Sequence, residues 1–178
     1  MKKRNGAAKS IIVLTAICLV ISAVLAVVND VTSPVIAQAA AARAEEARRE
    51  VLPEADGFEL VSVEEVPESV TEVYRATNHT GYVFMLTAKG YGGDMNLTCA
   101  IGGDGKIIAC KTLSHSETAG LGSKTAGDDY RNQYIGQDST LSGVSAISGA
   151  TISSTTYYNA IKDAFTAFEI VTGQEGAE

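Results

Sequence analysis

The chain has 178 residues, with 14 basic and 21 acidic side chains and a formal net charge of −7. Four basic residues precede residue 11 and no acidic residue does, so the rest of the chain carries ten basic against 21 acidic residues, a net charge of −11. This acidic balance argues against nucleic acid and against an anionic membrane surface as partners. The chain after Pro53 is long enough for one domain with its own core and too short for two.

An uncharged apolar run extends from Ile11 to Val28. At about 1.5 Å per residue, a helix of this length just crosses the bilayer core, so we predict a transmembrane helix over 11–28. Four basic residues, Lys2, Lys3, Arg4 and Lys9, lie directly before the apolar run, and the residues directly after it carry none. The positive-inside rule therefore places the tail 1–10 in the cytoplasm and the rest of the chain outside. A cleaved signal peptide is the alternative. We favour a retained anchor, because the best cleavage signal, Ala37-Gln38-Ala39, lies far beyond the apolar run.

Residues 29–52 are rich in Ala, Arg and Glu, which are strong helix formers. Glu45 and Glu46 lie at helical spacing from Arg49, as in a solvated helix. We therefore predict a helical stalk that Pro53 ends. An extracytoplasmic domain over 53–172 and a disordered tail over 173–178 complete the predicted organisation.

The domain begins with a strand-rich section, in which turn signals at 78–81 and 102–105 separate neighbouring strands. Five strands are predicted: Phe58–Val66, Glu72–Thr77, Gly81–Ala88, Asn96–Ile101 and Lys106–Leu113. Their order along the chain predicts an antiparallel meander.

The turn at Asp104-Gly105 predicts a hairpin in which Ile101 faces Ile108 and Cys99 faces Cys110. An oxidising compartment would allow a disulfide between these cysteines, and a buried, unbridged pair is equally consistent with the sequence. The sequence shows no spacing typical of a metal site.

The remainder of the domain is polar and glycine-rich from 114 to 127, with a short helix predicted over 128–134. A final helix is predicted over 153–171, and its buried face is marked by Tyr158, Ile161, Phe165 and Phe168. Strands followed by helices indicate the α+β class. We expect the helices to pack on one face of the sheet and to leave a cleft at its edge.

The segment Ser148-Gly149-Ala150-Thr151 directly precedes this last helix. The first turn of a helix has unpaired N–H groups and a dipole that favours negative charge, so a phosphate fits there. The small residues Gly149 and Ala150 permit close approach, and the Thr151 hydroxyl is a point of attachment. An ordinary helix N-terminus is the alternative interpretation of the same residues.

This segment resembles the flavinylation motif of the FMN-binding domain family. The resemblance implies FMN joined to Thr151 by a phosphoester, with Ser148, Gly149, Ala150, Ile152 and Ser153 around it. The family motif has an Asp three residues before its Ser, and Ser145 stands at that position here. The acceptor hydroxyl is unaffected by this difference.

Two further segments resemble the same family, in the family's order. Residues 115–122 resemble a loop that lies against the flavin ring, which implies that Glu117, Thr118, Leu121 and Gly122 line the site; Ala119 replaces a family Pro. Residues 89–92 resemble its Lys-Gly-Tyr-Gly segment, which implies Lys89 and Tyr91 as further site residues. For Tyr91, packing at a strand end is the alternative.

Together with the anchor, these segments resemble the G subunits of Rnf ion-translocating electron-transport complexes and, less closely, the C subunits of sodium-translocating quinone reductases. The resemblance implies an electron carrier between ferredoxin and NAD, with other membrane subunits, a flavin transferase and membrane lipid as partners. No catalytic acid, base or nucleophile, no metal ligand and no complete active site of its own is implied. The alternatives are a free-standing extracytoplasmic flavoprotein of an electron-export route, and a non-redox surface domain of the same fold.

Overall fold

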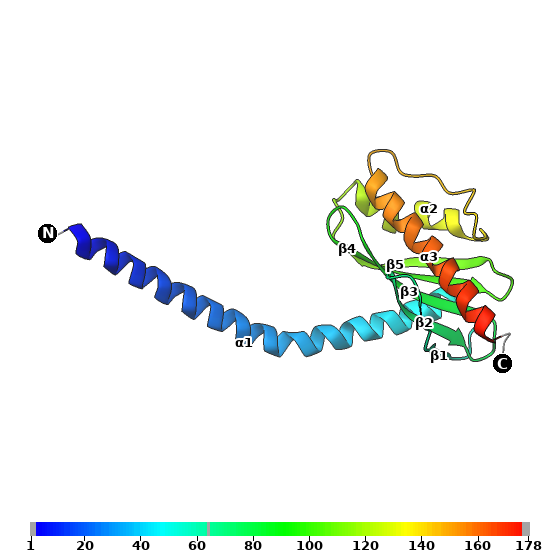
Figure 1. The fold of residues 1–178 in the computed structure, drawn as a ribbon, viewed down its shortest axis with the longest axis horizontal. Coiled ribbons are helices and arrows are strands. Elements are labelled where there is room, and N and C mark those ends of the chain that lie inside the picture. The colour runs from blue at the N-terminus through cyan, green and yellow to red at the C-terminus, as the bar shows by residue number, and fades with distance from the viewer. Residues whose placement is uncertain (1–2, 64, 176–178) are drawn as a thin grey trace. The chain divides into compact units, whose positions relative to one another are not determined.

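A computed structural model describes residues 3–63 and 65–175 of the chain (Figure 1). The chain forms two compact units, residues 1–43 and residues 44–178. The first two residues of the predicted basic tail and the last three of the predicted C-terminal tail lie outside the described residues.

The first element is the helix α1, Lys3–Val51. It contains both the predicted apolar helix and the predicted stalk, and it continues through Pro34. Proline lacks the N–H that would bond four residues back. In the turn before it, the Thr32 hydroxyl donates to the carbonyl oxygen of Val28 at 2.8 Å. By length and composition, α1 is apolar enough to cross a membrane, and none of its most apolar part is buried in the structure.

The last turns of α1 belong to the second unit, which begins at Ala44. Our expectation of a solvated stalk was wrong here, because Ala47, Val51 and Leu52 are each at most 2 % exposed. Val51 and Leu52 form a core cluster with Val83 and other residues of the sheet. These helical turns are therefore part of the folded domain.

The sheet is an antiparallel meander with the strand order β1-β2-β3-β4-β5, which confirms the predicted topology (Figure 1). Its strands are β1 Phe58–Val61, β2 Val70–Ala76, β3 Gly81–Lys89, β4 Asp94–Gly102 and β5 Ile107–His115. Strand β1 ends five residues before its predicted end at Val66. The backbone at Glu65 is left-handed, with φ 62°, and Pro67 follows, so the ladder does not continue through these residues.

The hairpin of β4 and β5 pairs Cys99 with Cys110, as predicted. The prediction that Ile101 faces Ile108 was wrong: Ile101 pairs with Ile107, because the register shifts between Ala100 and Ile101. Both cysteines are buried free thiols, with their Sγ atoms 3.2 Å apart. Burial, followed by the neighbouring Cys110 thiol, raises the pKa of Cys99 well above its ordinary value.

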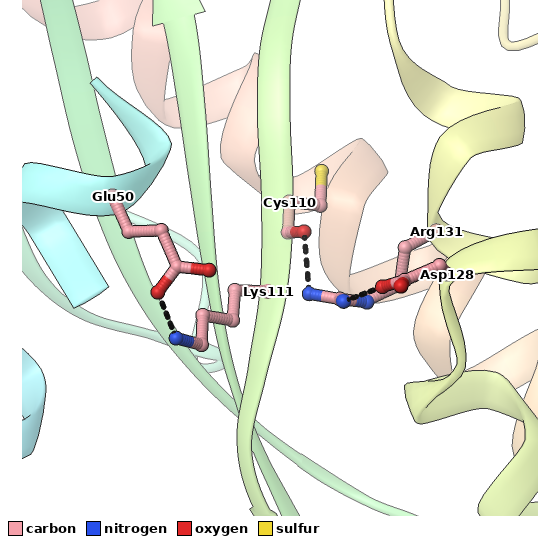
Figure 2. A network of polar contacts seen from close by, with 5 residues as sticks. All are labelled: Glu50, Cys110, Lys111, Asp128 and Arg131. Carbon is pink, nitrogen blue, oxygen red and sulfur yellow. Dashed lines mark hydrogen bonds and ion pairs between the residues drawn. The ribbon is translucent and has the colours of Figure 1, made fainter. Parts of the chain in front are cut away.

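Strand β5 is also tied to the elements beside it (Figure 2). Lys111 forms an ion pair with Glu50 of α1. Arg131 pairs with Asp128 and donates to the carbonyl oxygen of Cys110 at 3.3 Å. Ion pairs that are open to solvent contribute little to the free energy of folding. These contacts therefore serve mainly to hold the ends of α1 and α2 in position against β5.

The helices that follow the sheet cover one of its faces, as predicted, while the end of α1 packs on Val83 and its neighbours. They are η1 Gly122–Ala126, α2 Asp128–Arg131, η2 Asn132–Tyr134 and α3 Thr151–Glu175. On α3, Ile161 and Phe165 are buried, and Tyr158 and Phe168 are partly buried against the core. The helix begins two residues before the predicted start and is still helical at 173–175, which we expected to be a disordered tail.

Tyr157 of α3 packs against Tyr130 and Tyr134, and the ring centroids of the three tyrosines lie 5.2 to 5.6 Å apart. The Tyr130 and Tyr134 hydroxyl oxygens lie 3.0 Å apart, and Tyr130 donates to the carbonyl oxygen of Ser154 at 3.1 Å. Burial raises the pKa of all three phenols above the ordinary value.

These raised pKa values predict a loss of stability at alkaline pH. Well below pH about 10 the tyrosines are protonated in both the folded and the unfolded state, so their titration takes nothing from the free energy of unfolding. Above it, unfolded tyrosines release protons that the folded ones retain, so each lowers the free energy of unfolding by about 1.4 kcal/mol per pH unit. Denaturant unfolding at pH 9 to 11.5 measures this slope. Tyr134→Phe is expected to reduce it, and an equal slope in wild type and variant would contradict the prediction.

Candidate functional site

Three segments far apart in the chain meet at the N-terminal end of α3 and surround a cavity of about 510 Å³. This volume lies within the usual range of small-molecule sites. Its lining consists of ten residues, all named from the sequence: Tyr91, Glu117, Thr118, Leu121, Gly122, Gly149, Ala150, Thr151, Ile152 and Ser153. The structure therefore brings the three motif segments to one place.

Thr151 is the first residue of α3 and is exposed at the cavity. The first hydrogen bond of the helical ladder runs from the Ser154 N–H to the Ala150 carbonyl oxygen, at 2.9 Å, so the amides of 151–153 precede the ladder. Gly149 has φ 81°, a left-handed conformation that glycine adopts without strain. The chain thereby turns directly into the helix and leaves the Thr151 hydroxyl at its start.

Glu117 connects the three segments. Its carboxylate accepts a hydrogen bond from the Gly92 N–H at 3.1 Å and another from the Ser153 hydroxyl at 2.5 Å. The residue is only 8 % exposed. Because Ser153 is the third residue of α3, this carboxylate lies at the positive end of the helix dipole, where a negative charge is stabilised.

Exposed apolar side chains line the cavity beside Thr151. Tyr91 is 71 %, Ile152 57 % and Leu121 47 % exposed. One side chain comes from each of the three segments. Large apolar side chains gathered around a concave site are typical of places that bind a planar aromatic group or a partner.

Two residues named from the sequence do not line the cavity. Lys89 is the last residue of β3, and its carbonyl oxygen accepts a hydrogen bond from the Thr156 hydroxyl of α3 at 3.2 Å. Ser148 is exposed in the turn before α3. Ser145, at the position of the family Asp, is also exposed, and its backbone N–H donates to the Gln133 side chain at 2.9 Å.

Two glycines of the 90–93 turn, Gly90 and Gly92, were not predicted from the sequence as site residues. The Gly92 N–H is a direct partner of Glu117, and Gly90 lies so close that a Cβ there would be 2.1 Å from the Glu117 Oε1 atom. The signal was present as three glycines within four residues, 90–93. Their purpose becomes visible only when Glu117, about 25 residues later, is brought against them.

The lining contains one carboxylate, Glu117, and one phenol, Tyr91. Within residues 3–63 and 65–175, no group of three or more His, Cys, Asp or Glu is arranged to hold a metal ion. What the site offers is a helix N-terminus, the exposed residue Thr151 with its hydroxyl, and an apolar surface. Together these suit a ligand with a phosphate at one end and an aromatic system at the other.

Comparison with known proteins agrees with this geometry. The FMN-binding domain family matches residues 90–166, a range that contains the whole cavity lining. The G subunit of an ion-translocating oxidoreductase complex from Methanosarcina acetivorans is 32 % identical over 94 % of this chain and 96 % of its own length. The chain belongs to this G-subunit family.

Other members of the G-subunit family are similar over most of their length. The G subunit of the proton-translocating ferredoxin:NAD(+) oxidoreductase complex of Clostridium ljungdahlii is 29 % identical over 90 % of both chains. Its counterpart in the Na(+)-translocating ferredoxin:NAD(+) oxidoreductase complex of Acetobacterium woodii is 31 % identical over 80 % of this chain and 82 % of its own. The G-subunit family thus includes subunits of complexes that are named for different ions.

Proposed function

We propose that the chain is a membrane-anchored electron carrier that holds FMN covalently on Thr151 and works as the G subunit of an Rnf-type, ion-translocating ferredoxin:NAD oxidoreductase complex. The observation that carries the proposal is the position of Thr151. It is the first residue of α3 and lines the cavity, whose lining lies within the range that matches the FMN-binding domain family.

The residues present fit this cofactor. The phosphate would lie at the start of α3, where unpaired amides and the helix dipole favour an anion. Attachment by a flavin transferase would form a bond from the Thr151 oxygen to the FMN phosphorus of FAD. The pyrophosphate bond of FAD would break, AMP would leave and the hydroxyl proton would pass to solvent. The small residues Gly149 and Ala150 leave room for the phosphate beside the backbone.

The ring would lie against the apolar side chains of Tyr91, Leu121 and Ile152. When bound, FMN supplies the electron-transfer chemistry, and the protein supplies the tether, the orientation and the electrostatics. The exposure of these side chains leaves the ring open to an electron donor or acceptor. A covalent tether outside the membrane also prevents loss of the cofactor from a site this open.

The remaining parts of the proposal concern the membrane. Because four Lys and Arg residues lie directly before the apolar part of α1 and none directly after it, the N-terminus would be cytoplasmic and the flavin domain extracytoplasmic. Ala16, Ser22 and Ala23 are small residues of the kind that let membrane helices pack closely, here against the helices of other subunits.

The proposal is tested by mass spectrometry of the peptide that contains Thr151, after expression with a flavin transferase and FAD. One FMN adduct on Thr151 is expected. Detergent extraction of the native complex is expected to co-purify other integral membrane subunits with this chain. An adduct without such partners would favour the free-standing carrier instead, and no adduct at all would favour a non-redox domain.

Replacing Leu121 with Asp is expected to change the flavin absorption spectrum and to make its midpoint potential more negative, while attachment continues. A carboxylate beside the ring disfavours added electrons by on the order of 1–2 kcal/mol, or tens of millivolts for a one-electron couple. The control is Leu60→Asp, because Leu60 is an exposed apolar residue of β1. It is expected to leave the flavin spectrum and the midpoint potential unchanged. If both variants keep the wild-type potential, Leu121 does not contact the ring.

A further inference from the structure

We propose that Glu117 is a positioning residue whose buried carboxylate clasps the 90–93 turn, the 115–122 loop and the first turn of α3 together in the arrangement that receives the flavin. The inference rests on the proposed function. Its basis is that the two carboxylate oxygens each serve a different segment: Oε1 accepts from the Gly92 N–H and Oε2 from the Ser153 hydroxyl.

The packing around Glu117 shows that this position is built for it. A Cβ on Gly90 would lie 2.1 Å from Oε1, and a Cβ on Gly122 would lie 2.3 Å from Oε2. Any other residue at either position would push the carboxylate away from its partners. Two glycines therefore let two segments close on one acidic side chain, which leaves it 8 % exposed.

A clasp of this kind matters because the hydrogen bonds within the 118–125 segment join only residues close in sequence. Leu121 and Gly122 follow the 118–120 turn, whose hydrogen bonds are local ones, such as Leu121 N–H to the Thr118 carbonyl oxygen. A buried carboxylate that lost one donor would be left partly unpaired and desolvated, so breaking either bond weakens the attachment of all three segments. The loop thereby keeps its place relative to Thr151.

The charge of Glu117 has a second consequence. Its partners, an amide and a hydroxyl, are neutral, and a phosphoester on Thr151 would bring another negative charge to the same helical turn. The carboxylate therefore disfavours electrons added to the flavin nearby. This effect separates a role at the site from one in general stability, because the removal of the charge alone shifts the midpoint potential.

Two substitutions separate the clasp from the charge. Glu117→Gln keeps the shape, because the amide oxygen can accept from Gly92 and the amide nitrogen can donate to the Ser153 oxygen. Glu117→Ala removes both bonds. Glu169→Gln is the matched control, since it removes an exposed carboxylate from α3 about 24 Å along the helix from Ser153.

In the full-length apo protein, Glu117→Ala is expected to accelerate hydrogen exchange of the Gly92 amide about fivefold or more, while Glu117→Gln and Glu169→Gln leave it unchanged. With transferase and FAD, Glu117→Ala is expected to lower the initial rate of flavinylation about tenfold or more. In flavinylated protein, Glu117→Gln is expected to shift the midpoint potential to a more positive value, and Glu169→Gln to leave it in place.

The clasp would be overturned if the Gly92 amide exchanged at the wild-type rate in a folded Glu117→Ala variant. It would also be overturned if this variant were flavinylated at the wild-type rate. If Glu117→Gln and Glu169→Gln shifted the midpoint potential of the flavin equally, the Glu117 charge would not be positioned at the flavin. If Glu117→Ala does not fold, Ser153→Ala removes one of the two bonds and carries the same expectation for exchange. Failure of the wild type to form any adduct would reject the proposed function, whereas exchange in the apo protein decides the clasp independently.

Discussion

Thr151→Ala is expected to abolish covalent flavin attachment and to leave the domain folded. The hydroxyl is the proposed bond-forming atom, so its removal leaves no acceptor at the start of α3. Thr151 is exposed, and a surface substitution of this kind changes the free energy of unfolding by about 0.5 kcal/mol or less. In-gel fluorescence under denaturing conditions, with expression beside a flavin transferase, measures attachment, and denaturant unfolding measures the fold.

Thr151→Ser is the matched variant, because it retains a hydroxyl and loses only a methyl group. We expect it to keep part of the fluorescent band. Thr155→Ser, four residues later on α3, should keep the band in full, since Thr155 is exposed, does not line the cavity and is not the proposed acceptor. An adduct that persists in Thr151→Ala would show that the phosphoester lies on another residue, and the attachment site would then be misassigned.

The exposed position of Ser145 allows a test of how the transferase recognises its substrate. Its backbone N–H is engaged with Gln133, while its side chain faces solvent, so an aspartate fits there without repacking. Restoring the family's acid with Ser145→Asp is expected to raise the yield of the Thr151 adduct. An unchanged yield would mean that the transferase reads the Ser148–Thr151 segment alone.

Two hairpins of the meander were predictable because the turns that close them, at 78–81 and 102–105, each have their own sequence signature. What failed depended on contacts outside those turns. Valines recur at 63 and 66 and favour a longer strand, yet β1 ends at Val61 and the backbone is left-handed at Glu65. The bulge that pairs Ile101 with Ile107 leaves no mark that distinguishes it from a regular hairpin.

The end of α1 shows a different limit. Glutamate and arginine dominate this stretch, so its composition indicates a solvated helix. Burial comes from a narrow stripe of small and aliphatic residues, Ala47, Val51 and Leu52, whose meaning depends on the sheet they cover. A stripe of three residues on a short helical segment is too weak a periodic signal to separate a docked helix from an exposed one.

At the site, the sequence supplied the residues and the structure supplied their relations. The three motif segments were recognisable individually, and each contributes some of its residues to the cavity wall. The link between Gly92, Glu117 and Ser153 joins positions separated by 25 and 36 residues. No periodicity or spacing encodes a contact of that range, so the clasp had to be found in the fold.

The full-length chain is expected to stay in the membrane, whereas a variant that begins at Ala44 should be recovered in the soluble fraction as a folded domain. The physical basis is the division of the chain. The apolar part of α1 is fully exposed and long enough to cross a bilayer, and both core clusters lie after residue 43. Each fully apolar residue exposed to water costs on the order of 1 kcal/mol or more, so an uncovered run of this length partitions into lipid.

Fractionation distinguishes the two forms, and protease applied to the outer face of intact cells tests the orientation. Wild-type chain should require detergent for extraction, and external protease should remove the flavin domain while leaving the basic N-terminus protected. The variant that begins at Ala44 should show the same thermal unfolding transition as the domain in the full chain, because Val51 and Leu52, which complete its second core cluster, are retained. A soluble mature form beginning near Ala40 would contradict the anchor and establish cleavage, because the apolar run would then act as a signal peptide.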